Sequence, residues 1–114
     1  MDEFGIEVGQ REGCTVVAVR GEVDLATAPA LKNCLLDLVA GGVTEIVVDL
    51  SSTDFLDSTG LGAVVAAYKR VRVHEGHLKL VATSARVKRV FEITNLDRVV
   101  PICATVEEAC AAFG

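Results

Sequence analysis

Apolar and polar positions along this chain follow two different periods, and the period changes several times. Residues 4–8 alternate and residues 14–20 are rich in β-branched side chains, which predicts two half-buried strands with a turn at 9–13. Since only this turn joins them, they are expected to form an antiparallel hairpin. The short apolar runs at 45–50, 77–82 and 99–102 predict three further strands.

Four other segments show the apolar period of an amphipathic helix. Each follows or begins at a residue whose side chain can cap a helix, namely Thr27, Ser58, Ser84 or Thr105. The first of these helices is expected to end at Gly41, because glycine readily takes the backbone conformation found beyond a helix end.

The resulting order is strand, strand, helix, and then alternating strands and helices. This order predicts an α/β fold with a mixed, mostly parallel sheet of about five strands, an N-terminal hairpin and four helices. The 114 residues fit one domain over 1–114, without a linker or an internal repeat.

Composition and charge limit the binding partners and the cellular location that can be expected for the protein. A net charge of −5 argues against direct binding to nucleic acid, although residues 69–98 are rich in bases. No apolar run reaches the roughly 18–20 residues of a membrane helix, so no membrane contact is expected. The acidic N-terminus does not resemble a secretory signal, which predicts a cytoplasmic location.

Signatures of the common catalytic sites are missing from the sequence. There is no nucleophile elbow, no Walker A loop and no dinucleotide-binding glycine motif. His74 and His77 are the only pair whose spacing approaches that of metal ligands, and no two cysteines form a CxxC pair. We therefore expect no catalytic residue, no metal and no cofactor.

The four cysteines occupy positions where apolar side chains are expected: Cys14, Cys34, Cys103 and Cys110. In a reducing compartment they are predicted to be reduced and to act as core filler. A redox switch that uses Cys103 or Cys110 is the alternative.

The segment 49–62 combines features that are unusual for a connecting loop. It follows the most buried strand and opens a helix, at the sheet edge where α/β proteins bind ligands and partners. Ser58 is expected to be the helix N-cap, and the glycines that follow it would let another protein approach closely. Phe55 and Leu56 either tuck under the sheet or touch a partner. In the simpler alternative, Ser58 only caps the helix.

Residues 57–62, with the sequence Asp-Ser-Thr-Gly-Leu-Gly, resemble the phosphoacceptor motif of bacterial anti-sigma factor antagonists of the STAS domain family. Residues 21–29 resemble the second signature of that family, and the resemblance runs through essentially the whole chain. It implies partner switching in transcription regulation, as in a stress response. The unphosphorylated antagonist binds an anti-sigma factor serine kinase, which frees the sigma factor without touching it directly. A serine phosphatase reverses the phosphorylation.

The resemblance also implies roles for individual residues. Ser58 matches the phosphorylated serine, Thr59 is its nearest competitor, and Asp24 matches an acid beside the acceptor site. The expected partner-binding residues are Asp24, Thr27, Phe55, Leu56, Asp57, Ser58, Thr59, Gly60 and Leu61.

A phosphate on Ser58 would add a charge of about −1.5 to −2 at a helix N-terminus. The helix dipole and free N–H groups are expected to hold it there, while the acidic patch becomes repulsive to a partner. Two alternatives stay open. One is an unphosphorylated STAS module that binds a nucleotide or scaffolds a signalling assembly, and the other is a thiol-based redox-sensing regulator.

Overall fold

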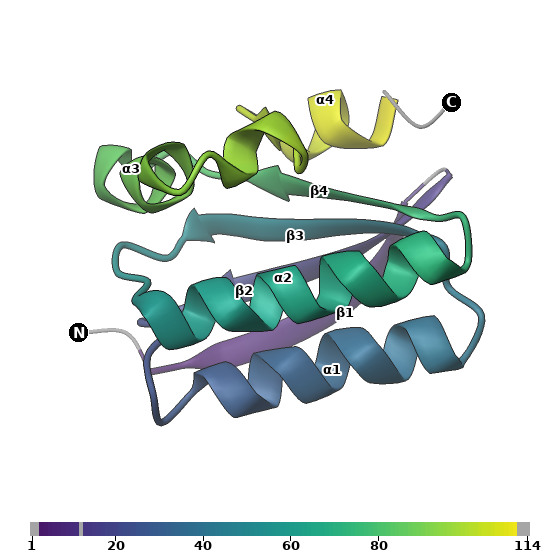
Figure 1. Cartoon of the computed structure of the whole chain (residues 1–114), viewed down its shortest axis with the longest axis horizontal. Coiled ribbons are helices and arrows are strands. Elements are labelled where there is room, and N and C mark those ends of the chain that lie inside the picture. The colour runs from purple at the N-terminus through teal and green to yellow at the C-terminus, as the bar shows by residue number, and fades with distance from the viewer. Residues whose placement is uncertain (1–2, 12, 112–114) are drawn as a thin grey trace.

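The computed structural model describes residues 3–11 and 13–111 (Figure 1). Within these residues the elements follow in this order: β1 (Gly5–Arg11), β2 (Cys14–Arg20), α1 (Ala28–Ala40), β3 (Glu45–Ser52), α2 (Ser58–Val73), β4 (His77–Val81), α3 (Ala85–Ile93), the 3₁₀ helix η1 (Leu96–Arg98), β5 (Ile102–Cys103) and α4 (Val106–Ala111). The predicted order of strands and helices is confirmed.

The strands form one mixed sheet with the order β1-β2-β3-β4-β5. β1 pairs antiparallel with β2, and the other pairs are parallel, so the predicted fold class is confirmed. β3 lies between β2 and β4. Its consecutive residues Val47 and Val48 are both fully buried, on opposite faces of the sheet, as the uninterrupted apolar run predicts.

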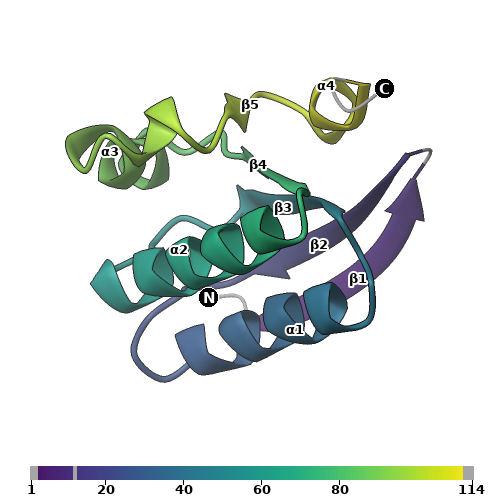
Figure 2. The same cartoon turned by 45° about the vertical axis from the view of Figure 1, so that its right-hand side comes forward.

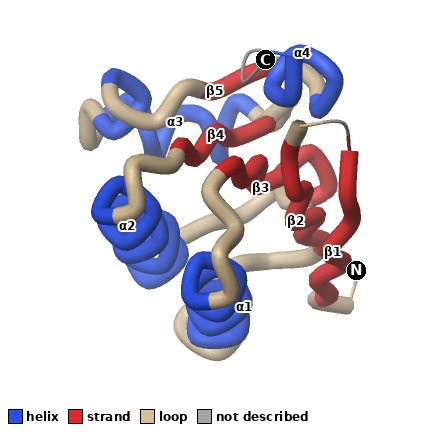
Figure 3. Tube along the Cα trace, turned by 90° about the vertical axis from the view of Figure 1, so that its right-hand side faces the viewer, coloured by secondary structure: helices blue, strands red, loops and turns tan. Residues whose placement is uncertain are grey.

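The two faces of the sheet are covered differently. α1, α2 and α3 pack on one face and bury the larger core, which includes Leu35, Val64 and Phe91. α4 lies on the opposite face, over a smaller cluster that includes Val47 and Ala109. Figures 2 and 3 show this arrangement, with α1 and α2 on one side of the strands and α4 on the other.

Two strand boundaries lie more than two residues from those predicted. The segment 9–13 was expected to be a turn, but β1 continues to Arg11, which pairs with Cys14. Gly13, with a positive φ of 79°, allows this tight reversal. The last strand was expected at 99–102, but Val99 and Val100 continue from η1, and the Val100 N–H donates to the Leu96 carbonyl.

The helix caps are confirmed at two of the four predicted positions. Ser84 Oγ accepts the Val87 N–H at 3.4 Å, and Thr105 Oγ1 accepts the Glu108 N–H at 3.1 Å. Thr27 stands at the N-cap of α1, but its side chain makes no capping hydrogen bond. Ser58 is not the cap of α2 but the first residue of that helix.

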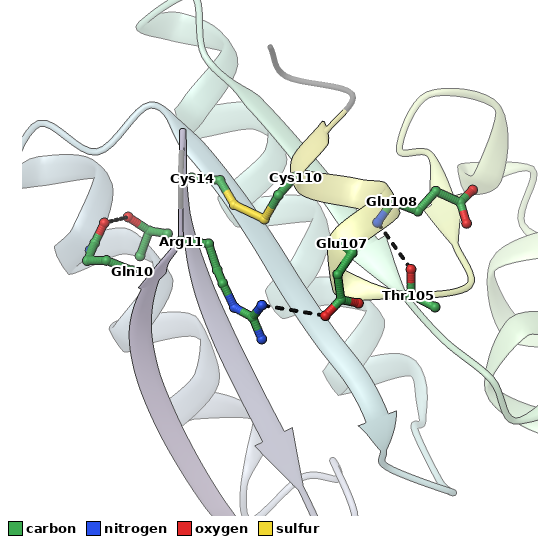
Figure 4. Close-up of a disulfide and its surroundings, with 8 residues drawn as sticks. Gln10, Arg11, Cys14, Thr105, Glu107, Glu108 and Cys110 are labelled. Carbon is green, nitrogen blue, oxygen red and sulfur yellow. Dashed lines mark hydrogen bonds and ion pairs between the residues drawn. A yellow bond between two sulfur atoms is a disulfide. The ribbon is translucent and has the colours of Figure 1, made fainter.

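The prediction that all four cysteines are reduced is wrong. Cys14 and Cys110 form a disulfide, with their Cα atoms 5.8 Å apart, and it joins the start of β2 to α4 (Figure 4). The fold brings these residues together across a separation of 96 positions, which composition and compartment could not reveal. Cys34 and Cys103 are free thiols.

Candidate functional site

The two segments with motif-like sequences lie side by side in the structure. One joins β2 to α1, the other joins β3 to α2, and both lie at the left-hand end of the molecule in Figure 1. The Val23 N–H donates to the Phe55 carbonyl at 3.0 Å, and the Asp57 N–H donates to the Val23 carbonyl at 3.2 Å. These bonds form a short parallel bridge, so each loop fixes the position of the other.

Asp57 is the residue that caps α2. Its Oδ1 accepts the N–H of Thr59 at 2.9 Å and that of Gly60 at 3.2 Å, and it also accepts the Thr59 hydroxyl. The hydrogen bond from that hydroxyl is the main cause that lowers the pKa of Asp57, and the two N–H groups add to it against a smaller effect of burial. Asp57 also has the extended φ and ψ angles of an N-cap residue.

Ser58 lies exposed at the first position of α2. Because Asp57 serves as the cap, no hydrogen bond from the described residues engages the Ser58 hydroxyl. The oxygen is therefore open to a modifying enzyme. The simpler alternative, in which Ser58 only caps the helix, is wrong.

The Asp24 carboxylate organises the loop before α1. Its Oδ1 accepts the N–H of Ala26 at 3.0 Å and that of Thr27 at 3.1 Å. The Thr27 hydroxyl accepts the Asp24 N–H at 2.9 Å and donates to the Glu22 carbonyl at 2.8 Å. Both side chains therefore shape the loop. Asp24 is half-buried, so part of its negative charge faces solvent.

Two expected contact residues are buried beneath the site. Leu56 is only 3% exposed and belongs to the main core, so of the two alternatives it follows the one in which it tucks under the sheet. Gly60 is also buried, and a Cβ there would lie 2.8 Å from Val23 Cγ1 and 2.9 Å from Leu56 Cγ. Gly60 therefore lets α2 pack closely on the bridge between the loops.

Other apolar side chains around the site remain at the surface. Phe55 is 37% exposed and Leu25 is 75% exposed. A groove of about 440 Å³ between α1 and α2 is lined by Leu25, Pro29, Lys32, Thr59 and Gly62. A Cβ on Gly62 would meet nothing within 4 Å, so packing within the chain does not require a glycine at this position.

Sequence reasoning missed the contribution of α1 to this surface. The groove is lined in part by Leu25, Pro29 and Lys32. In the sequence, only the second motif had pointed to this part of the chain. Leu25 could have been noticed, because it is an apolar residue outside the stripe of the following helix.

A second, polar cavity of about 490 Å³ lies beyond the carboxyl ends of the strands, at the start of α3. Hydroxyl and carboxylate side chains line it, including Glu22, Ser52, Asp54 and Ser84. Its described lining contains neither lysine nor arginine, which triphosphate-binding sites commonly provide.

Residues 3–11 and 13–111 contain neither a metal-binding cluster nor a membrane-spanning helix. No group of histidine, cysteine, aspartate and glutamate side chains there could hold a metal ion. None of the helices among these residues is long and apolar enough to cross a membrane.

Comparison with known proteins places this arrangement in a family. Residues 5–109, which include both loops of the site, match the STAS domain. The chain is 36% identical over 104 residues to an anti-sigma-B factor antagonist of Bacillus subtilis, a match that covers 91% of this chain and 94% of the relative.

Two solved structures extend the similarity to the fold. An anti-sigma factor antagonist from Mycobacterium paratuberculosis matches with a TM-score of 0.89 and 33% identity, over 97% of this chain and 94% of the other. The Bacillus cell fate determinant SpoIIAA in its phosphorylated form matches with a TM-score of 0.74 and 25% identity, over 98% of this chain and 100% of the other. The resemblance predicted from the two motifs is confirmed.

Proposed function

Because the chain belongs to the STAS domain family, we propose that it is an anti-sigma factor antagonist controlled by phosphorylation of Ser58. In its unmodified form it binds an anti-sigma factor that is also a serine kinase, and this binding releases a sigma factor. Phosphorylation breaks the complex, and a serine phosphatase restores the active form. The protein is then a regulator rather than an enzyme, and it works in the cytoplasm with the transcription machinery.

The exposed hydroxyl of Ser58 is the observation that carries this proposal. A kinase transfers the γ-phosphoryl group of ATP to Ser58 Oγ. The new P–O bond forms as the bond to ADP breaks, and the hydroxyl proton passes to a base of the kinase. Thr59 is a poorer acceptor, because it is half-buried and its hydroxyl donates to Asp57.

The surroundings of Ser58 explain how one phosphate can act as a switch. Asp57 already engages the N–H groups of Thr59 and Gly60, so these groups are not free to neutralise a phosphate on Ser58. The phosphate would stand in solvent next to the carboxylate of the neighbouring residue Asp57. An interface would then have to desolvate a concentrated negative charge. A loss of about 3–4 kcal/mol would weaken binding several-hundredfold or more.

The groove between α1 and α2 supplies the apolar part of the proposed docking surface. Leu25 presents an exposed apolar side chain in this groove, which also reaches Thr59, the residue after Ser58. A Cβ on Gly62 would meet no atom within 4 Å, so the groove is open on that side. An apolar side chain of the kinase that enters this groove would bring its own backbone close to α2. Contact residues and phosphoacceptor would thereby form one continuous surface.

The alternative of a nucleotide-binding module is less well supported. The polar cavity at the start of α3 is lined by Glu22 and Asp54, whose carboxylates would repel a nucleoside triphosphate. Calorimetry with ATP or GTP alone distinguishes the two functions, and we expect no binding heat from either nucleotide.

The test uses the cognate anti-sigma factor serine kinase with ATP, followed by mass spectrometry of the phosphopeptides. We expect the phosphate on Ser58, its loss in Ser58→Ala with binding retained, and weakened binding of Ser58→Glu. Thr59→Ala is the matched control and should still be phosphorylated. A phosphate found on Thr59, or a Ser58→Ala variant that no longer binds the kinase, would contradict the proposal.

A further inference from the structure

The second face of the sheet depends on one short helix for its cover. A small apolar cluster lies there, which includes Val16, Val47, Val81 and Ala109. α4 contributes the buried Ala109 to the cluster, and its half-buried Val106 and Cys110 pack against it. α1 and α2 pack on the other face and cannot replace α4 if it leaves (Figure 3).

α4 is short, and its apolar contact with the cluster comes from three side chains, those of Val106, Ala109 and Cys110. The helix has six residues, and isolated helices shorter than about 12–15 residues are marginal in water. Its ion pair, Arg11 Nη1 to Glu107 Oε1 at 3.5 Å, joins two side chains that are both more than half exposed (Figure 4). Such surface pairs contribute little to stability. The covalent bond between Cys14 and Cys110 is therefore the strongest connection between α4 and the sheet.

We propose that Cys14 and Cys110 form a reversible redox latch that fastens α4 over the second face of the sheet. In the oxidised form the disulfide holds α4 on its apolar cluster. In the reduced form α4 detaches locally, and Val16, Val47 and Val81 become accessible to water. The inference rests on the fold alone and stands whether or not Ser58 is phosphorylated.

The redox step balances as thiol–disulfide exchange with a small disulfide. The two thiols lose two protons and two electrons as the Cys14–Cys110 bond forms, and the small disulfide becomes two thiols. Reduction runs in the opposite direction with a dithiol. Cys14 is only 6% exposed whereas Cys110 is half-buried, so an attacking thiolate reaches Cys110 Sγ first and expels the thiolate of Cys14.

The other two cysteines are poor competitors in this exchange. Burial raises the pKa of the Cys34 thiol, and the carboxylate of Asp37 raises it further. Burial also raises the pKa of the Cys103 thiol, as does the carboxylate of Glu108, against a smaller opposite effect of Lys79. Because the thiolate is the nucleophile in exchange, both side chains should react slowly.

The test compares the full wild-type chain after treatment with oxidised glutathione and after treatment with dithiothreitol. Thiol titration of the unfolded chain should find two thiols in the first sample and four in the second. Hydrogen exchange should accelerate about a hundredfold in residues 106–111 on reduction, while β3 and α2 keep their protection. Cys110→Ser should behave like the reduced form, and Cys34→Ser should respond like wild type.

Three results would overturn the latch. The first is four titratable thiols after oxidation, because no disulfide would then exist. The second is equal protection of α4 in both forms, because α4 would then stay docked without the bond. The third is loss of protection throughout the sheet on reduction, because the disulfide would then hold the entire fold rather than α4. The reduced wild-type chain carries no substitution, so a misfolded variant cannot obscure the result.

Discussion

One oxygen atom accepts the capping hydrogen bonds of the first turn of α2. Oδ1 of Asp57 accepts two backbone N–H groups and the Thr59 hydroxyl, all of which favour the ionised carboxylate. The same bonds lower the pKa of Asp57. A neutral amide at this position could still accept the N–H groups, but it would not titrate. This difference allows the cap to be tested by pH.

The first prediction compares wild type with Asp57→Asn across acid pH. Because the folded-state pKa of Asp57 is lowered, its contribution to stability is complete above its unfolded pKa of roughly 4. That contribution is lost as the pH falls through the folded-state value. The Tm of wild type should therefore exceed that of Asp57→Asn at pH 7, and the difference should shrink below about pH 4. A difference that is constant from pH 7 to pH 2 would contradict this.

The second prediction uses Gly60 and Gly62, which lie in the same helix but differ in their surroundings. A methyl group at Gly60 would clash with Val23 and Leu56, so Gly60→Ala should destabilise the fold by about 1–3 kcal/mol. Gly62 faces open space, so Gly62→Ala should stabilise α2 by about 0.5–1 kcal/mol. Urea denaturation measures both changes.

The substitutions at the two glycines should also differ in their effect on binding of the anti-sigma factor kinase. Gly62→Ala fills part of the groove between α1 and α2, so it should weaken binding roughly tenfold despite its stable fold. A Gly62→Ala variant that binds like wild type would remove this groove from the docking surface.

At the level of single residues, the exposure of Ser58 was predicted correctly, but its role as the helix cap was not. Ser58 is exposed at the start of a helix, as expected, but the neighbouring Asp57 caps that helix. Aspartate and serine are both good caps, so their order in the sequence does not decide between them. The backbone decides, because Asp57 has the extended φ and ψ angles of a cap residue.

At the level of elements, the loop between β3 and α2 has a buried and an exposed side. Leu56 enters the main core and pairs across the bridge with Val23, whereas its neighbour Phe55 is partly exposed. The alternation follows from the extended backbone at this bridge, where successive side chains point in opposite directions. One loop thus fixes the site to the sheet and presents it to a partner.

The third prediction separates these two roles by substitution of adjacent residues. Leu56→Ala should leave a cavity and lower the free energy of unfolding by about 2–5 kcal/mol. Phe55→Ala should change stability much less but weaken binding of the kinase, because it removes exposed apolar surface from the loop before Ser58. Urea denaturation and calorimetric titration provide the two readouts. Equal effects of both substitutions on stability would contradict the assignment.

The order of elements was predictable because each helix and strand is encoded locally by its period. Boundaries were less predictable where a tertiary contact extends an element. β1 continues through Gly9 and Arg11 because β2 offers hydrogen-bonding partners for both, although the composition suggested a turn. The 3₁₀ helix η1 begins after Asn95, whose positive φ of 60° no apolar period reveals.

At the level of the whole molecule, the predictable features are those that the sheet topology imposes. Parallel strands place their carboxyl ends at one edge, so the two motif-bearing loops had to lie near each other. The Cys14–Cys110 disulfide joins opposite ends of the chain, and only the assembled fold brings them together. The exposure of Phe55 and the burial of Leu56 likewise depend on packing.

The fourth prediction concerns the response of the whole fold to phosphorylation. This unmodified chain has the same fold as a relative solved in its phosphorylated form, with a TM-score of 0.74. Ser58 faces solvent and its hydroxyl bonds to none of the described residues, so a phosphate there displaces no contact in the core. Hydrogen exchange of the phosphorylated chain should therefore change only in the first turn of α2 and in the loop before α1. If protection changed throughout β2, β3 and β4, the switch would act by rearranging the sheet rather than by altering the charge of a preformed surface.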